Sequence, residues 1–136
     1  MQTEDAAQLI AATAELMSPP TDVIDLEQPG LWGLQVSDVD VVVSFQQNTE
    51  VFTLQTFDEF PQGADQAAVY RMLLQRNIRQ PGAASFRTAI DPTDHDIVSE
   101  TDIEASGLDC TAFGNHVSDF AAAVRNLRQE VRFNES

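Results

Sequence analysis

Hydrophobic and polar residues alternate with two different periods along this chain, and the change of period divides the chain into helices and strands. Apolar residues recur at helical spacing in residues 6–17, and two prolines then end the predicted helix. Residues 31–36, 39–46 and 50–58 instead alternate with a period of two, as strands with one buried face do. The turns between these three segments are short, which predicts an antiparallel meander. Residues 21–30 are acidic and are predicted to be a connector.

The second half of the chain predicts a helix, two strands and a long final helix. The middle helix is capped by Asp65 and runs to about Ile78, and strands follow at residues 84–90 and 95–103. The final helix carries a narrow apolar seam with spacings of three and four residues. Its members are Cys110, Phe113, Val117, Phe120, Val124, Leu127 and Val131.

This order predicts an α+β fold, α-β-β-β-α-β-β-α, in which three helices lie against a twisted antiparallel sheet. A length of 136 residues suits one domain, so residues 1–136 are taken as a single domain. Three helices on a five-stranded sheet cannot all bury their apolar faces easily. The first and middle helices are therefore candidates for a dimer interface or a binding groove.

Charge is distributed unevenly and restricts the possible partners. The first 70 residues contain twelve carboxylates and no lysine, arginine or histidine, and the formal net charge of the whole chain is −15. All seven basic residues are arginines between Arg71 and Arg132. Such a surface repels phosphate backbones and anionic lipids, so neither nucleic acid nor a membrane is an expected partner. The arginines are interpreted first as intramolecular neutralisation, with a contact between two copies of the chain as the alternative.

The lack of a recognisable signal peptide and the single cysteine indicate that the protein is cytoplasmic. The N-terminus is acidic where a signal peptide would be basic, and no apolar run reaches membrane-spanning length. The single cysteine, Cys110, excludes an intramolecular disulfide and fits a reducing compartment.

Candidate catalytic and metal-binding residues are sparse. The acidic stretch from Asp91 to Asp102 is a possible cation site, but it lacks the glycine and the distal glutamate of a calcium loop. Cys110 and His116 are six residues apart on a helix, which places them on different faces. We therefore expect no enzyme activity, no cofactor and no metal.

The element order and one local pattern resemble the class I type III secretion chaperones, the Tir-chaperone family. The pattern is Leu73-Leu74-Gln75-Arg76-Asn77 in the middle helix, a strand ending at Ile90-Asp91, and then Leu108, Phe113, Phe120 and Val124 in the last helix. The resemblance spans roughly residues 3–133. It implies a homodimeric cytoplasmic chaperone of a Gram-negative bacterium, which binds the extended N-terminal region of an effector and uses no nucleotide.

The resemblance also implies where the partners bind. The first helix and the early strands would supply apolar patches for the effector, together with strand addition to a sheet edge. The residues expected in these patches are Leu9, Ile10, Leu16, Trp32, Leu34, Phe45 and Phe52. The middle helix would contribute to the dimer interface. The residues expected there are Ala67, Tyr70, Arg71, Leu74 and Ile78.

Two other hypotheses remain open at this point. The first is an acidic interaction protein, such as an immunity-type inhibitor, that binds a basic partner through charge on the same fold. The second is a metal-dependent enzyme that uses the region from Asp91 to Asp102.

Overall fold

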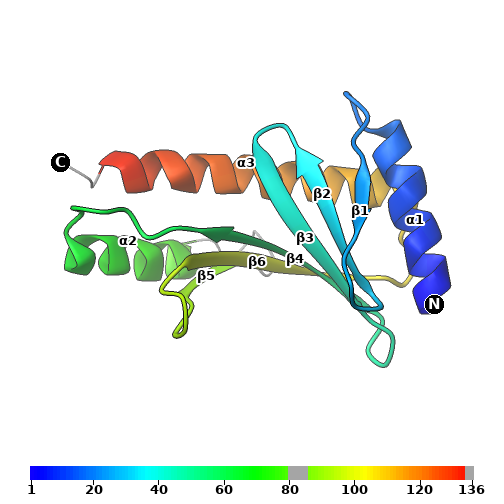
Figure 1. The fold of residues 1–136 in the computed structure, drawn as a ribbon, viewed down its shortest axis with the longest axis horizontal. Coiled ribbons are helices and arrows are strands. Elements are labelled where there is room, and N and C mark those ends of the chain that lie inside the picture. Colours follow the sequence, from blue (N-terminus) through cyan, green and yellow to red (C-terminus); the bar gives the residue numbers. More distant parts are fainter. Residues whose placement is uncertain (80–85, 134–136) are drawn as a thin grey trace.

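The computed structural model describes the backbone of residues 1–79 and 86–133, and the side chains of all of these except residues 78, 79 and 133. Within these ranges the chain forms the α+β fold that the pattern predicts, with the helices on a single antiparallel sheet (Figure 1). The helices are α1 (Thr3–Leu16), α2 (Gln66–Arg79) and α3 (Cys110–Phe133). The strands are β1 (Val23–Asp25), β2 (Leu31–Val36), β3 (Val39–Gln46), β4 (Val51–Asp58), β5 (Arg87–Ile90) and β6 (Ile97–Glu104).

The sheet has six strands in the order β1-β2-β3-β4-β6-β5, and every neighbouring pair is antiparallel. Strands β2, β3 and β4 form the predicted meander. Strand β6 then pairs with β4 over its whole length, and β5 pairs with the outer side of β6. The two edges of the sheet are therefore β1 and β5.

Strand β1 corrects the prediction that residues 21–30 form only a connector. Val23 pairs with Leu34 and Asp25 pairs with Trp32, so the order becomes α-β-β-β-β-α-β-β-α. A three-residue strand is too short for alternation to be visible in the sequence. It forms because β2 offers an unpaired side to the segment that returns from α1.

The second pair of strands is shorter than predicted. His95 does not belong to β6 but lies in the preceding turn with a positive φ of 61°, and β6 begins at Ile97. The Asp91 side chain shapes this turn by accepting a hydrogen bond from the backbone N–H of Thr93 at 2.8 Å. Strand β5 begins at Arg87, and residues 84 and 85 of the predicted strand lie outside the described residues.

All three helices lie on one face of the sheet, and they take different positions along it. Figure 1 shows α3 running along the molecule behind the strands, with α1 at the β1 end and α2 at the β5 end. The predicted seam of α3 is confirmed, since all of its members are buried except Cys110, which is partly exposed. No helix in the described ranges has the combination of length and apolar character that crossing a bilayer requires.

The core consists of two clusters of unequal size. The larger one joins α1 and the first part of α3 to the inner faces of β2, β3, β4 and β6. The smaller one anchors α2 at the other end of the molecule. It contains Val69 and Leu73 of α2, Ile97 of β6, and Leu127 and Val131 of α3. Helix α2 therefore depends on few buried side chains, and no helix or strand in residues 1–79 and 86–133 covers its outer face.

Candidate functional site

The first candidate surface is the α1–α3 groove, which we define by Thr13, Leu16, Met17, Cys110 and Gly114. It is a cavity of about 330 Å³ between the C-terminal end of α1 and the N-terminal end of α3. Leu16 is 68% exposed beside it, an unusual exposure for a leucine on a helix that otherwise packs in the core. Leu16 and Met17 give the groove an apolar side. Polar side chains also line it, namely those of Ser18, Thr111, Asn115 and Ser118. An extended segment of another chain therefore finds both kinds of contact there.

The second candidate surface is the β1 edge, formed by Val23, Ile24 and Asp25. It follows the groove directly, because the backbone N–H of Thr21 donates to the carbonyl of Ala14 at 3.1 Å and brings the chain back beside α1. Ile24 is 59% exposed on the face of the sheet that no helix covers. An edge strand with an exposed apolar side chain is a site where an extended peptide can pair.

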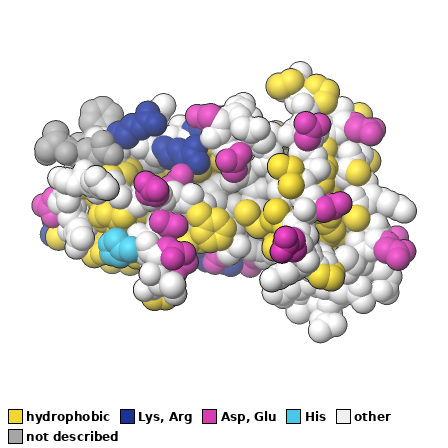
Figure 2. All heavy atoms as spheres, in the orientation of Figure 1, with side chains coloured by type: hydrophobic (Ala, Val, Ile, Leu, Met, Phe, Trp, Pro, Cys, Tyr) yellow, Lys and Arg dark blue, Asp and Glu magenta, His cyan; other side chains and the backbone are white. Residues whose placement is uncertain are grey.

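Carboxylates surround this end of the molecule. Asp22, Asp25 and Glu27 are exposed, and none of the ion pairs between described residues involves them. Figure 2 shows acidic and apolar side chains together over α1 and β1 on the face drawn, whereas the visible arginines lie toward α2 and the C-terminal half of α3. Six of the twelve carboxylates among the first 70 residues belong to α1 or to residues 22–27, so half of that negative charge lies in the segments that border the groove and the β1 edge.

The residues predicted to contact an effector fall into two groups. Leu16 is exposed and Leu9 is partly buried at the margin of the core. The others lie inside the core, with exposures of 7% or less. They are Ile10, Trp32, Leu34, Phe45 and Phe52. The most strongly apolar positions of the pattern are those that the helices cover, because burial of these side chains drives the helices onto the sheet.

The third candidate surface is the α2–β5 surface, defined by Tyr70, Leu73, Leu74, Ala89 and Ile90. These residues line a cavity of about 370 Å³ with almost entirely apolar walls. Leu74 is 64% exposed at its rim. An apolar hollow of this kind at the edge of a sheet is typical of a surface that another protein covers.

The predicted dimer residues belong to the same helix as this surface. Tyr70 and Leu74 line the hollow, while Ala67 and Arg71 are exposed on α2. The side chain of Ile78 lies outside the described residues. Ala89 and Ile90 are not among the residues predicted from the sequence, and they belong to the surface only because β5 lies beside α2.

An aromatic contact holds Tyr70 in place at this surface. Its hydroxyl lies 3.1 Å from Nε2 of His95, in the turn before β6. The ring of Phe60 packs against both, with centroids 5.5 Å from Tyr70 and 4.9 Å from His95. Residues from the segment before α2, from α2 itself and from the β5–β6 turn therefore define the shape of the surface together.

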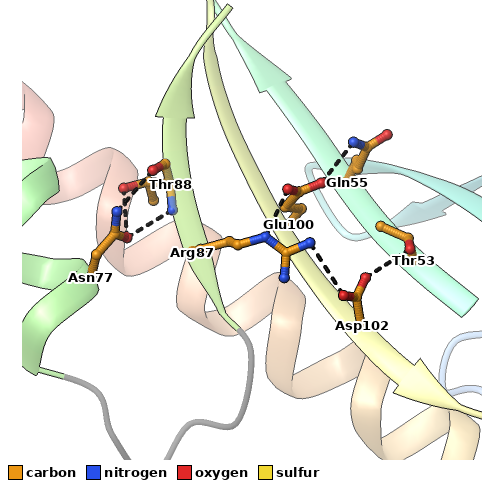
Figure 3. A network of polar contacts seen from close by, with 7 residues as sticks. All are labelled: Thr53, Gln55, Asn77, Arg87, Thr88, Glu100 and Asp102. Atoms are coloured by element: carbon orange, nitrogen blue, oxygen red, sulfur yellow. Dashed lines mark hydrogen bonds and ion pairs between the residues drawn. The ribbon is translucent and has the colours of Figure 1, made fainter. Parts of the chain in front are cut away.

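Polar contacts fix β5 on both of its sides (Figure 3). On one side, the Asn77 amide of α2 bonds with both backbone groups of Thr88. On the other, Arg87 Nε donates to Glu100 Oε1 at 2.8 Å, and Arg87 Nη2 lies 3.3 Å from Asp102 Oδ2. On the face of the sheet that no helix covers, these ion pairs therefore link β5 to β6.

Three arginines on the helices also pair within the chain. Arg76 Nη1 lies 2.9 Å from Glu130 Oε1, and Arg128 Nη2 lies 2.9 Å from Asp58 Oδ1. Arg125 approaches Asp38 at 4.0 Å. Intramolecular neutralisation, the first interpretation of the arginines, is confirmed for these three and for Arg87.

The described residues contain no group of three or more histidine, cysteine or acidic side chains arranged to hold a metal ion. In the acidic stretch, the Asp91 carboxylate is engaged by the backbone of its own turn. Cys110 lines the α1–α3 groove and His116 is exposed on the same helix. Neither residue has a partner arrangement that activates a nucleophile in the described part of the chain.

One comparison with known proteins identifies a family. The model of the Tir chaperone protein (CesT) family matches residues 21–128. No curated protein sequence matches the chain.

Three solved complexes contain chains of similar structure. A chain of the HopA1–SchA chaperone–effector complex has a TM-score of 0.69 at 11% identity, and the similarity covers 93% of this chain and 95% of that one. A chain of the Yersinia pestis complex of the type III secretion chaperone SycH with a YscM2 fragment has a TM-score of 0.61 at 13% identity, covering 86% and 98%. A chain of the ExoT–SpcS complex from Pseudomonas aeruginosa has a TM-score of 0.62 at 15% identity, covering 88% and 95%. At these identities the similarity establishes the fold.

Proposed function

The chain belongs to the Tir chaperone protein (CesT) family, and on this premise we propose that it is a homodimeric chaperone in the cytoplasm of a Gram-negative bacterium. It binds the extended N-terminal region of a type III secretion effector and keeps that region soluble and competent for secretion. The family match over residues 21–128 carries the proposal. The exposed surfaces at the two ends of the sheet would bind the effector and the second copy of the chain.

The α1–α3 groove and the β1 edge bind the effector. An unfolded effector segment exposes apolar side chains and unpaired backbone groups. Leu16 and Ile24 cover the apolar side chains of the segment, and the edge of β1 pairs with its backbone groups. Leu9 contributes at the margin, whereas the buried residues such as Trp32 and Phe52 shape the surface from beneath. Binding is non-covalent and needs no nucleotide, cofactor or metal.

The acidic charge around these sites keeps the complex in solution. A bound apolar segment lowers the solubility of its carrier unless the surrounding surface is strongly charged. The exposed carboxylates Asp22, Asp25 and Glu27 lie beside the β1 edge and serve this purpose. The same charge repels nucleic acid and anionic membranes.

The α2–β5 surface forms the homodimer. Leu74 and Tyr70 supply its apolar centre, and Ala67 and Arg71 flank them on α2. Ile78, one turn further along the helix, remains a predicted member. Pairing two copies about a two-fold axis covers both hollows with the same residues, which is the usual symmetry of a soluble dimer.

Two exposed leucines allow the two surfaces to be tested against each other. We expect Leu74→Glu to halve the mass measured by light scattering, because a like-charge pair would be buried at the dimer centre. The same variant should retain its fold, since Leu74 is 64% exposed. Leu16→Glu, at a leucine 68% exposed, should remain dimeric but lose binding. The binding assay is co-purification with a co-expressed N-terminal fragment of a type III secretion effector.

Each leucine variant is the control for the other. A strictly monomeric wild-type protein would contradict the dimer, and an effector fragment that stays insoluble with the wild-type chain would contradict the chaperone function. If Leu16→Glu and Leu74→Glu had the same effect on mass and binding, the separation of the two surfaces would be wrong.

The charge distribution favours one alternative, an inhibitor that binds a basic partner by electrostatic attraction. Exposed charges are screened beyond about 8–10 Å at physiological salt, so binding of that kind weakens sharply as salt is raised. Binding through Leu16 and the β1 edge instead persists at high salt. Measurement of the affinity for the effector fragment at low and high salt therefore distinguishes the two functions.

A further inference from the structure

The two edges of the sheet differ in whether their outward backbone groups are free. In an antiparallel pair, alternate residues direct both N–H and C=O toward the neighbouring strand, and the residues between them direct theirs away. On an edge strand, the second set is available to another chain. Hydrogen bonds at the ends of β1 and β5 show which residues belong to each set.

The outward groups of β1 are open. The N–H of Leu26 donates to the carbonyl of Leu31 at 3.2 Å, so these two residues form a hydrogen-bonded pair. Ile24, two residues earlier and opposite Gly33, belongs to the same set. Val23 and Asp25 therefore direct their N–H and C=O groups away from β2. None of the turn, loop or capping hydrogen bonds among the described residues involves the backbone of these two.

A hydrogen bond at the end of β5 shows in the same way which of its residues direct their backbone groups toward β6. The N–H of Asp91 donates to the carbonyl of Asp96 at 2.8 Å, and this pair continues the register in which Ile90 lies opposite Ile97. Arg87 and Ala89 are then bonded to β6. Thr88 is the central residue of the strand that directs its backbone groups outward.

The outward groups of Thr88 are already occupied by the side chain of Asn77. Asn77 Nδ2 donates to the Thr88 carbonyl at 2.9 Å, and Asn77 Oδ1 accepts from the Thr88 N–H at 2.8 Å. Figure 3 shows the amide of Asn77 facing the edge of β5 from α2. A carboxamide has the donor and acceptor of a peptide group, so it makes the two bonds that a residue of a further strand would make.

We propose that Asn77 closes the β5 edge and so restricts strand addition to β1. The part of the inference that concerns β1 rests on the proposed function, since the added strand there is the effector. The part that concerns β5 does not depend on a partner. An open β5 edge would pair with a further copy of this chain, in addition to the copy held by the homodimer contact, because an unpaired strand edge associates readily with another unpaired edge.

The test compares two substitutions at one position. Asn77→Ala removes both bonds and frees the Thr88 backbone. We expect its mass in light scattering to increase with concentration, to about twice the wild-type value or more. Asn77→Asp also loses the bond to the Thr88 carbonyl, but it leaves a negative charge at the edge, which opposes strand pairing. It should keep the wild-type mass.

The location of the new contact is checked by hydrogen exchange. In Asn77→Ala, exchange at the Thr88 amide should be fast at low concentration, where the mass equals that of the wild type, and slow at concentrations where the mass is raised. The wild-type protein provides a readout that needs no variant. Hydrogen exchange at the Thr88 amide should be as slow as at the ladder amide of Ala89.

Three results would overturn the proposal. The first is an Asn77→Ala variant that keeps its native circular dichroism and the wild-type mass at every concentration. The second is association of Asn77→Ala and Asn77→Asp to the same extent, which would indicate loss of the anchoring of α2 rather than an opened edge. The third is fast exchange of the wild-type Thr88 amide. None of these results bears on whether the chain binds an effector, so the proposed function stands or falls separately.

Discussion

Single residues of the same chemical type have opposite roles in this chain. Phe52 and Phe57 both belong to β4, but an odd separation places them on opposite faces of the sheet. Phe52 is fully buried, with its ring 4.8 Å from that of Phe45 and 5.0 Å from that of Phe113. Phe57 is 48% exposed on the uncovered face. The family resemblance implies that Phe52 contacts the effector, whereas the structure makes it a part of the core.

This difference gives a prediction at the residue scale. Phe52→Ala should lower the free energy of unfolding by about 3–5 kcal/mol, because it leaves a cavity among aromatic side chains. Phe57→Ala, the control on the same strand, should cost less than about 1 kcal/mol because its side chain is half solvated already. Urea unfolding followed by fluorescence of Trp32 measures both. Equal losses for the two variants would contradict the burial described for β4.

At the scale of elements, β1 and α2 are the two parts that the rest of the fold leaves incompletely covered. Strand β1 has one neighbour in the sheet, and α2 is anchored mainly by the small cluster around Val69 and Leu73. Elements with few buried contacts open locally at lower free energy than the core does. They are also the elements that carry the proposed binding surfaces.

Because alternate N–H groups of β1 point toward β2 and away from it, proline substitutions at neighbouring residues can distinguish an effect on effector binding from an effect on stability. Val23→Pro removes an N–H that points away from the sheet, so it costs only the packing of the partly buried Val23 side chain and no hydrogen bond to β2. The same change should weaken effector binding by about 3- to 10-fold, which corresponds to one backbone hydrogen bond. Ile24→Pro instead removes an N–H directed at β2 and should destabilise β1. Thermal unfolding and an affinity measurement with the effector fragment test both variants.

The outcome against this prediction is specific. If Val23→Pro lowered the melting temperature as much as Ile24→Pro does, the outward direction of the Val23 backbone would be wrong. If it left the affinity unchanged, the effector would not pair with the β1 edge.

At the scale of the whole molecule, charge is the dominant feature. Among the described residues, four arginines form ion pairs that join segments distant in the sequence, for example Arg128 of α3 and Asp58 of β4. These pairs are partly exposed and each contributes little. Most of the carboxylates in the described residues form no ion pair, and with a formal net charge of −15 the folded chain repels itself.

Salt should therefore stabilise this protein. Raising sodium chloride from about 10 mM to about 200 mM shortens the screening distance to less than 10 Å and reduces the repulsion among carboxylates more than it weakens the ion pairs. We expect the melting temperature in differential scanning calorimetry to rise by a few degrees. A decrease over this range would show that the ion pairs outweigh the repulsion.

Much of the fold follows from local patterns. The period of two in residues 39–46 and the three-four spacing of the α3 seam predict β3 and α3, since each pattern describes one buried face of one element. The charge pattern likewise excludes nucleic acid as an expected partner without knowledge of the fold. Asp65 caps α2 as predicted, because the cap needs only residues next to each other in the chain.

The sequence by itself determined which residues form the buried faces, which elements they build, and that the chain is strongly acidic at one end. Only the tertiary structure decided which apolar residues remain for partners, because the helices cover Trp32 and Phe52 and leave Leu16 and Leu74 exposed. It also decided that residues 23–25 form an edge strand and that Asn77 closes the opposite edge through Thr88, eleven residues away. The physical reason is that periodicity reports the local environment of one element, whereas exposure and edge pairing depend on which other elements lie beside it.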